Sequence, residues 1–156
     1  MEKKFILTDK FVINSFGIKL FQIKCTKSFK YAQKGDFGGY VEKEGNLDQE
    51  NDAWVSDNAW VSGDAWVSGD AWVSGDADIE NDNEHCGFDG FGSCNRHTHA
   101  YMTKEKKVEI ICGCFRGSIE EFENKVEETH SGTVYEKQYK SIINVIKIKF
   151  GLTDFT

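Results

Sequence analysis

The sequence lacks any apolar run long enough to cross a membrane. Its longest apolar stretches, such as residues 108–114, fall well short of the roughly 20 residues that a membrane helix needs. The first ten residues include Lys3, Lys4 and Lys10 and lack the apolar core of a secretory signal peptide. We therefore expect a cytoplasmic protein.

A disulfide or zinc pattern is missing as well. The five cysteines are an odd number, and without a secretion signal we expect reduced thiols. Zinc sites usually contain cysteine pairs separated by two to four residues. The only candidates, with unusual spacings, are Cys86, Cys94, His97, Cys112 and Cys114. Buried thiols and a structural zinc site both stay open as interpretations, and no cofactor is indicated.

Charge is distributed unevenly along the chain, although the net charge is only −7. Residues 1–34 carry eight lysines against two acidic residues, and residues 85–156 carry ten groups of each sign. Residues 35–84 carry one lysine against fourteen acidic residues, a net charge of −13. Such a block attracts basic protein surfaces and repels nucleic acid. We expect a basic protein partner and no direct nucleic-acid binding; an acidic surface that only maintains solubility is the alternative.

A six-residue repeat is the strongest signal in the sequence. Residues 53–58 read Ala-Trp-Val-Ser-Asp-Asn, and residues 59–76 contain three copies of Ala-Trp-Val-Ser-Gly-Asp. Residues 77–82 form a degenerate last copy. A period of six excludes helix–turn–helix solenoids, whose units are far longer. Each copy predicts a short strand with Ala and Val on one side and Trp on the other. The corner that follows uses Gly, Asn or Asp, which tolerate left-handed backbone angles.

Three such strands and corners make a triangular coil of about eighteen residues. The repeat resembles the hexapeptide-repeat family of left-handed parallel β-helices, and this resemblance implies a rod with an apolar interior. The predicted interior side chains are Val55, Val61, Val67, Val73 and Ile79.

The outward side chains are the candidate binding residues. Positions eighteen apart should share a face, so the predicted stacked pairs are Trp54 with Trp72, Trp60 with Asp78, and Trp66 with Glu84. Four exposed tryptophans would form an adhesive surface, which favours a homo-oligomer, a dimer or trimer. The alternative is that terminal segments or neighbouring subunits cover them. The predicted partner-binding set is Trp54, Trp60, Trp66, Trp72, Asp64, Asp70 and Asp76.

The segment before the repeat predicts strands at residues 5–7, 11–13 and 18–25. We expect a β cap, because the end coil of a rod would otherwise expose apolar side chains and unpaired backbone. The sequence Gly-Asp-Phe-Gly-Gly-Tyr-Val-Glu at residues 35–42, followed by acidic residues and repeats, resembles phage and prophage proteins of the polymer-forming type. This resemblance implies a viral protein in the cytoplasm of a bacterial host.

The composition changes beyond residue 84. Residues 87–93 are rich in glycine and predict a linker, and residues 98–103 and 107–115 predict a hairpin. Capping boxes at residues 118–121 and 133–136 predict the starts of two helices. The sequence therefore predicts a small ββαα module with its own core.

Three domains are expected: a β cap at residues 1–46, a repeat rod at 47–84 and an α+β module at 85–156. In the last of these, residues 92–96 and the sequence Cys-Gly-Cys-Phe at 112–115 resemble a C-terminal module of the same phage-type proteins. The predicted fold is mainly β: a short left-handed parallel β-helix with an N-terminal β cap and a C-terminal ββαα module.

A non-enzymatic binding protein is the predicted function. An acidic rod imitates the charge of nucleic acid and fits the basic groove of a protein that binds it. Together with the phage-type resemblance, this predicts an inhibitor of a bacterial defence nuclease, similar to anti-CRISPR proteins.

Two alternatives stay open. The first is a structural β-helix protein that only assembles with itself. The second is a hexapeptide-repeat acyltransferase, a class in which a histidine on the β-helix acts as general base. The repeats contain no histidine, so His85 is the only nearby candidate.

Overall fold

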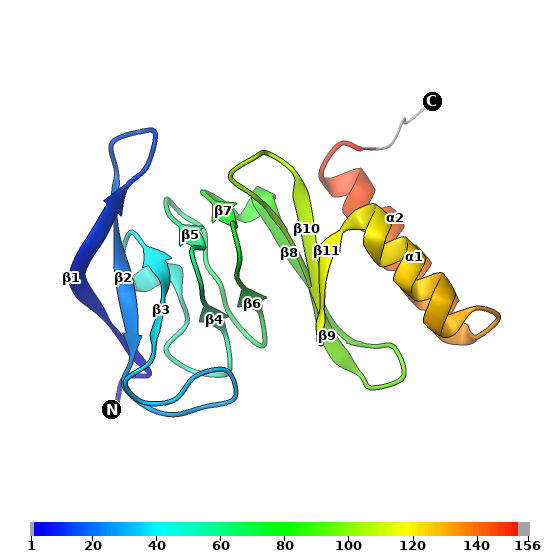
Figure 1. Cartoon of the computed structure of the whole chain (residues 1–156), viewed down its shortest axis with the longest axis horizontal. Coiled ribbons are helices and arrows are strands. Elements are labelled where there is room, and N and C mark those ends of the chain that lie inside the picture. Colours follow the sequence, from blue (N-terminus) through cyan, green and yellow to red (C-terminus); the bar gives the residue numbers. More distant parts are fainter. Residues whose placement is uncertain (1, 153–156) are drawn as a thin grey trace. The chain divides into compact units, whose positions relative to one another are not determined.

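The computed structural model describes residues 2–152, which are mainly β with two helices near the C-terminus (Figure 1). The chain divides into two compact units, the first ending at Asp82 and the second beginning at Asn83. The cap and repeat segments lie in the first unit, and the remaining strands and both helices lie in the second.

The first unit contains mixed, open sheets. Its strands are β1 (Phe5–Ile13), β2 (Lys19–Cys25), β3 (Phe37–Val41), β4 (Trp54–Val55), β5 (Trp60–Val61), β6 (Trp72–Val73) and β7 (Asp78–Ile79). One sheet has the order β1-β2-β3-β5-β7, in which the pairs among β1, β2 and β3 are antiparallel and the pairs among β3, β5 and β7 are parallel. Strands β4 and β6 form a second, parallel pair. The antiparallel strands β1, β2 and β3 therefore lie in the same sheet as β5 and β7, two strands of the repeat segment.

The eighteen-residue register is confirmed on two faces. Trp54 pairs with Trp72 and Trp60 pairs with Asp78, both in parallel. The third face differs from the prediction that Trp66 lies beneath Glu84. There Val67 forms a bridge with Leu47, and the backbone N–H of Trp66 donates to the Asp82 carboxylate at 2.9 Å. This face therefore carries a single bridge in place of a continuous strand pair.

The repeat corners follow the predicted chemistry. Each corner holds one residue in the left-handed region, with φ between 55° and 62°, at Asp57, Gly63, Gly69 and Gly75. At each corner the N–H of the next alanine donates to the serine carbonyl three residues earlier, at 3.2 to 3.3 Å. These turns change the direction of the chain every six residues. Each bend is occupied by a residue that tolerates positive φ.

The interior of the repeat is mainly apolar, with the fully buried Asn46 side chain donating to the Ala65 carbonyl at 2.8 Å. All five predicted core side chains are buried, and Val41 and Leu47 join them from the segment before the repeat. Val41 pairs with Val61, and Leu47 with Val67, twenty residues apart instead of eighteen. The two additional residues fall between Leu47 and Val55, so the segment that holds the short helix η1 (Glu44–Asn46) forms an earlier coil.

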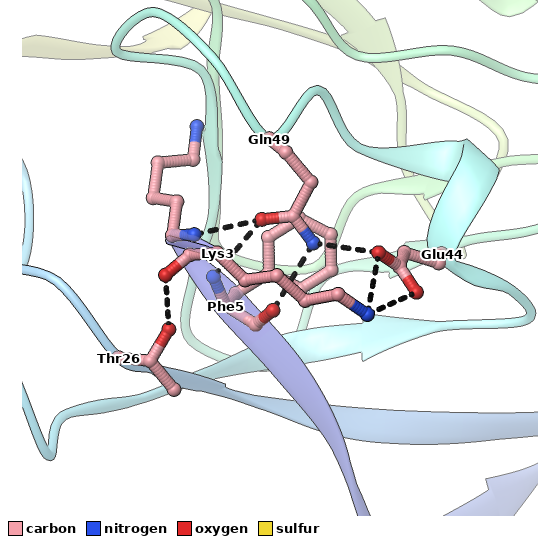
Figure 2. A network of polar contacts seen from close by, with 6 residues as sticks. Lys3, Phe5, Thr26, Glu44 and Gln49 are labelled. Carbon is pink, nitrogen blue, oxygen red and sulfur yellow. Dashed lines mark hydrogen bonds and ion pairs between the residues drawn. The ribbon is translucent and has the colours of Figure 1, made fainter. Parts of the chain in front are cut away.

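The inserted bend is tied to the start of β1 by side-chain hydrogen bonds. The Gln49 amide accepts from the Phe5 N–H at 3.2 Å and donates to the Phe5 carbonyl at 3.1 Å, as a neighbouring strand would. Its nitrogen also donates to Glu44, which pairs with Lys3 at 3.1 Å. Figure 2 shows this network, in which Thr26 donates to the Lys3 carbonyl on the other side of the strand.

The buried Lys4 side chain is hydrogen-bonded to backbone carbonyls. Its ammonium donates to the carbonyls of Glu50, Asn51 and Ala53, at 3.4, 3.3 and 2.5 Å, and lies 4.9 Å from the centre of the Phe29 ring. Burial lowers the pKa of this amine. The carbonyls compensate part of the desolvation cost, and the lysine closes the inserted bend from within.

The second unit is a four-stranded antiparallel meander followed by two helices. Its elements are β8 (His85–Phe91), β9 (Arg96–Met102), β10 (Val108–Cys112), β11 (Phe115–Ser118), α1 (Ile119–His130) and α2 (Val134–Lys149). The predicted linker at residues 87–93 is wrong, because most of it belongs to β8, which pairs with β9. The predicted strand at 107–115 is two strands joined by a tight turn. The module is therefore ββββαα instead of ββαα.

The two helices begin where expected, but only one capping box forms. The Ser118 hydroxyl accepts from the Glu121 N–H, and Glu121 accepts in return from the Ser118 N–H. The second predicted box is wrong: the Thr133 hydroxyl donates back to the His130 carbonyl. The predicted apolar faces pack against the sheet in a core that includes Phe122, Tyr139 and Ile143. No helix within residues 2–152 is long and apolar enough to span a membrane.

Candidate functional site

The corner carboxylates of the repeat lie at the surface. Asp64, Asp70 and Asp76 are all exposed. Lys43 is 3.9 Å from the Asp64 carboxylate, but this exposed pair contributes little stability. Because the three strand faces follow one another every six residues, these acidic residues occupy three successive corners.

Two of the four tryptophans are covered by the loop between β2 and β3. Trp54 is only 2% exposed and meets the Phe29 ring edge to face, with centroids 5.2 Å apart. The Trp72 ring stacks on Tyr31 at 5.2 Å and 16°, and its indole N–H donates to the Ser56 hydroxyl at 2.9 Å. The prediction that Trp54 is a partner-binding residue is therefore wrong for this structure, and Trp72 is half covered. The alternative of intramolecular cover holds for this face.

Trp66 is the tryptophan that faces solvent. Its side chain is 54% exposed, whereas Trp60 is half-buried. The corners directly before and after its strand position carry Asp64 and Asp70. Along the coil, the exposed indole thus lies between two corners that each carry an exposed carboxylate, and Asp76 lies on the corner after the next strand. We call Asp64, Trp66 and Asp70 the Trp66 face.

The predicted zinc candidates are not assembled into a site. Within residues 2–152 no group of three or more His, Cys, Asp or Glu side chains is placed to hold a metal ion. All five cysteines are free thiols. Cys112 is buried and its thiol lies 3.6 Å from the Tyr139 hydroxyl, whereas Cys94 and Cys114 are exposed. The structure separates these groups because they lie on different strands and turns of the meander.

His97 belongs instead to a chain of hydrogen bonds along β8 and β9. Asp89 Oδ1 lies 2.5 Å from His97 Nδ1, His97 Nε2 lies 2.9 Å from His99 Nδ1, and His99 Nε2 lies 2.9 Å from His85 Nδ1. With the carboxylate as acceptor and neutral rings, each histidine donates toward Asp89 through Nδ1. Gly87 makes room for these rings, since a Cβ there would lie 2.5 Å from the His97 ring. We call the four residues the histidine chain.

The centre of the histidine chain strongly resists protonation. Burial, together with the neighbouring His85 and His97, holds the pKa of His99 well below that of an exposed imidazole. His85, the candidate general base of the acyltransferase hypothesis, is itself buried against His99. The histidine chain is therefore a buried polar element of the second unit, and its environment favours the neutral form of His99.

The neutral state of His99 predicts an acid-sensitive second unit. The unfolded histidine titrates near pH 6.5 while the folded one titrates well below, so acid adds a proton only to the unfolded state. Its stabilising contribution is complete above about pH 6.5 and falls with decreasing pH, by at most about 1.4 kcal/mol per pH unit. We expect His99→Gln to flatten this dependence, measured by urea unfolding followed by circular dichroism of the helices, which lie in the second unit.

His130→Gln is the matched control, because His130 lies in the same unit but contacts aromatic rings instead of the histidine chain. It should leave the pH dependence unchanged. An acid dependence that is the same in wild type and His99→Gln would contradict the assignment.

No protein-family model and no curated protein matches the chain.

The sequence indicated the acidic corners and the tryptophans but not which tryptophans stay exposed. The covering residues, Phe29 and Tyr31, carry no recognisable signal beyond being aromatic residues in a loop. The histidine chain was also missed as a unit, although alternation along a strand places His97 and His99 on one face. Its partners on β8 were hidden because that segment was interpreted as a linker.

Proposed function

We propose that the chain is a non-enzymatic binding protein that docks on a basic surface of another protein through the Trp66 face. The observation that carries this proposal is the exposed Trp66 ring on the strand between two corners that carry the exposed Asp64 and Asp70. This face belongs to a segment with a net charge of −13, from residue 35 to residue 84.

The chemistry of the Trp66 face fits lysine and arginine side chains. An indole attracts a cation over its ring, with about 0.5–1 kcal/mol at an exposed site. The carboxylates at the two corners accept hydrogen bonds from lysine and arginine side chains of the partner and steer it during association. Nucleic acid is repelled by the same field. A lysine or arginine side chain of the partner would therefore be attracted by the carboxylates through its charge and would pack against the flat indole ring.

The partner class follows from the charge. Proteins that bind nucleic acid offer the basic surface that an acidic coil complements. With the phage-type resemblance, the proposed partner is a bacterial defence nuclease, and the proposed role is inhibition in the host cytoplasm, as in anti-CRISPR proteins. The eighteen-residue register supports the further proposal that the repeat is a short left-handed parallel β-helix.

A second copy of the chain is the competing partner. Residues 1–34 carry eight lysines against two acidic residues, and all of these lysines except the buried Lys4 contribute to the surface. The proposed dimer or trimer would use the Trp66 face in this case. Light scattering distinguishes the two, because a homo-oligomer forms in the purified protein and a docking protein requires the partner.

Replacing the two carboxylates of the Trp66 face should weaken docking most. We expect the double change Asp64→Asn and Asp70→Asn to lower the salt concentration at which a bacterial partner elutes from the immobilised protein. Asparagine keeps the corner-compatible backbone, so the fold should be retained. Charge attraction is screened over about 8 Å at physiological salt, so wild-type binding should itself weaken as salt rises.

Asp76→Asn is the matched control, because it removes the same charge from a corner that does not border Trp66. It should retain most of the binding. If Asp76→Asn and the double variant weakened binding equally for each charge removed, the general acidity of the coil would be responsible and not the Trp66 face.

A further inference from the structure

The second unit contains a cavity that the docking function does not use. It has a volume of about 230 Å³ and lies between the turn that joins β10 to β11, the loop before β9, and the two helices. Phe115, Phe122 and Val126 give it an apolar wall, and the last two are buried in the core. A wall of this kind accommodates a hydrocarbon or aromatic group.

The rim of this cavity is basic. Arg96, Lys125 and His130 line it, and no Asp or Glu is among its lining residues within the described chain. Lys125 forms an exposed ion pair with Glu128, at 3.9 Å. Within residues 2–152 Arg96 forms no ion pair with a carboxylate. In a protein of net charge −7, this is a locally positive hollow.

Arg96 lies against the turn that joins β10 to β11. Gly113 adopts a positive φ of 61°, and a Cβ at this position would overlap the Arg96 guanidinium. The guanidinium therefore lies directly on the Gly113 backbone, where any other residue would displace it. Its hydrogen bond to Cys94 lowers the pKa of that exposed thiol. Besides Cys94, the Cys112 thiol and the Tyr139 phenol lie close enough to interact electrostatically with Arg96.

Neutral donors complete the rim. The Tyr139 hydroxyl accepts the Cys112 thiol hydrogen at 3.6 Å, and burial and this neighbour raise the pKa of Tyr139, so the phenol keeps its proton. Ser93 and Thr129 add two further hydroxyls to the lining. A guanidinium and several neutral O–H groups are the donors that carboxylate and phosphate oxygens accept from.

We propose that this cavity binds a small organic anion, whose oxyanion group is held by Arg96 and whose apolar body packs against Phe115, Phe122 and Val126. The volume is below the range typical for drug-sized ligands, so the ligand is small. A carboxylate and a phosphate share the required chemistry. This site is independent of the Trp66 face, which lies in the other unit.

Titration of the isotopically labelled full chain with benzoate, phenyl phosphate and the neutral benzyl alcohol tests the proposal by NMR. We expect shifts of the amides around residues 93–96 and 112–115 with one or both anions, and binding at least about tenfold weaker for the alcohol. The stronger of the two anions identifies the head group. Equal binding of the alcohol, or no shifts with either anion at millimolar concentration, would overturn the proposal.

Arg96→Gln should weaken binding of the anion by about tenfold or more, because it removes a charge-assisted pair of hydrogen bonds. Arg116→Gln is the matched control: Arg116 is exposed, lies 3.9 Å from Glu109 and does not line the cavity. It should leave the affinity unchanged. Lys125→Gln provides a second variant of the rim should Arg96→Gln fold poorly, and unchanged affinity in a folded Arg96→Gln protein would exclude the assigned role.

Discussion

Val67→Asp will prevent the first unit from folding. Val67 is fully buried in the interior of the repeat and pairs with Leu47. The change removes about 1.5–3 kcal/mol of hydrophobic stabilisation and adds a buried charge without a partner, at a further cost of several kcal/mol. Whole domains are stable by only about 5–15 kcal/mol. We expect loss of the cooperative unfolding transition seen by tryptophan fluorescence, since all four tryptophans lie in this unit.

Ser68→Asp is the control, because it introduces the same charge one residue later on a half-buried side chain at the corner. It should keep a cooperative transition. Ser62 and Ser74 are unsuitable controls, because both are buried in this structure. Equal loss of structure in Val67→Asp and Ser68→Asp would mean that the assignment of inside and outside is incorrect.

Trp54→Ala will destabilise the first unit by about 3–5 kcal/mol, as expected for a large aromatic residue removed from a core. Its ring is buried against Phe29, which in turn lies under the Lys4 ammonium. Removing the indole ring therefore removes the surface against which the loop between β2 and β3 packs. Urea unfolding, followed by the fluorescence of the three remaining tryptophans, measures the change in free energy.

Trp66→Ala is the matched variant on the other face. With more than half of its side chain exposed, its loss should change the free energy of unfolding by about 0.5 kcal/mol or less. It should instead reduce partner binding. Equal destabilisation by Trp54→Ala and Trp66→Ala would contradict the division into a covered and an open tryptophan face.

The repeat was predictable because its information is local. Every copy combines a short strand with a corner residue that tolerates positive φ, so period, interior residues and two strand pairings follow from the sequence. The coil before it was not predicted. Val41 and Leu47 occupy equivalent interior positions, but the two residues inserted before Val55 break the period that identifies the others.

The candidate site depended on contacts distant in the chain. Whether a tryptophan is open or covered is decided by Phe29 and Tyr31, which lie more than twenty residues before the rings they cover. In the second unit, the glycines of residues 87–93 indicated a linker. Gly87 is instead part of β8, where it leaves space for the rings of His97 and His99. Glycine content alone does not distinguish flexibility from close packing.

Chemical labelling of carboxylates in the partner complex tests whether the partner docks on the Trp66 face. Reaction of exposed carboxylates with a carbodiimide and an amine, read by mass spectrometry, reports the accessibility of each acidic residue in free and bound protein. We expect strong protection of Asp64 and Asp70 in the complex, with little change at Asp76 or at Glu105 in the second unit. Unchanged labelling of Asp64 and Asp70, with protection only in the second unit, would contradict it.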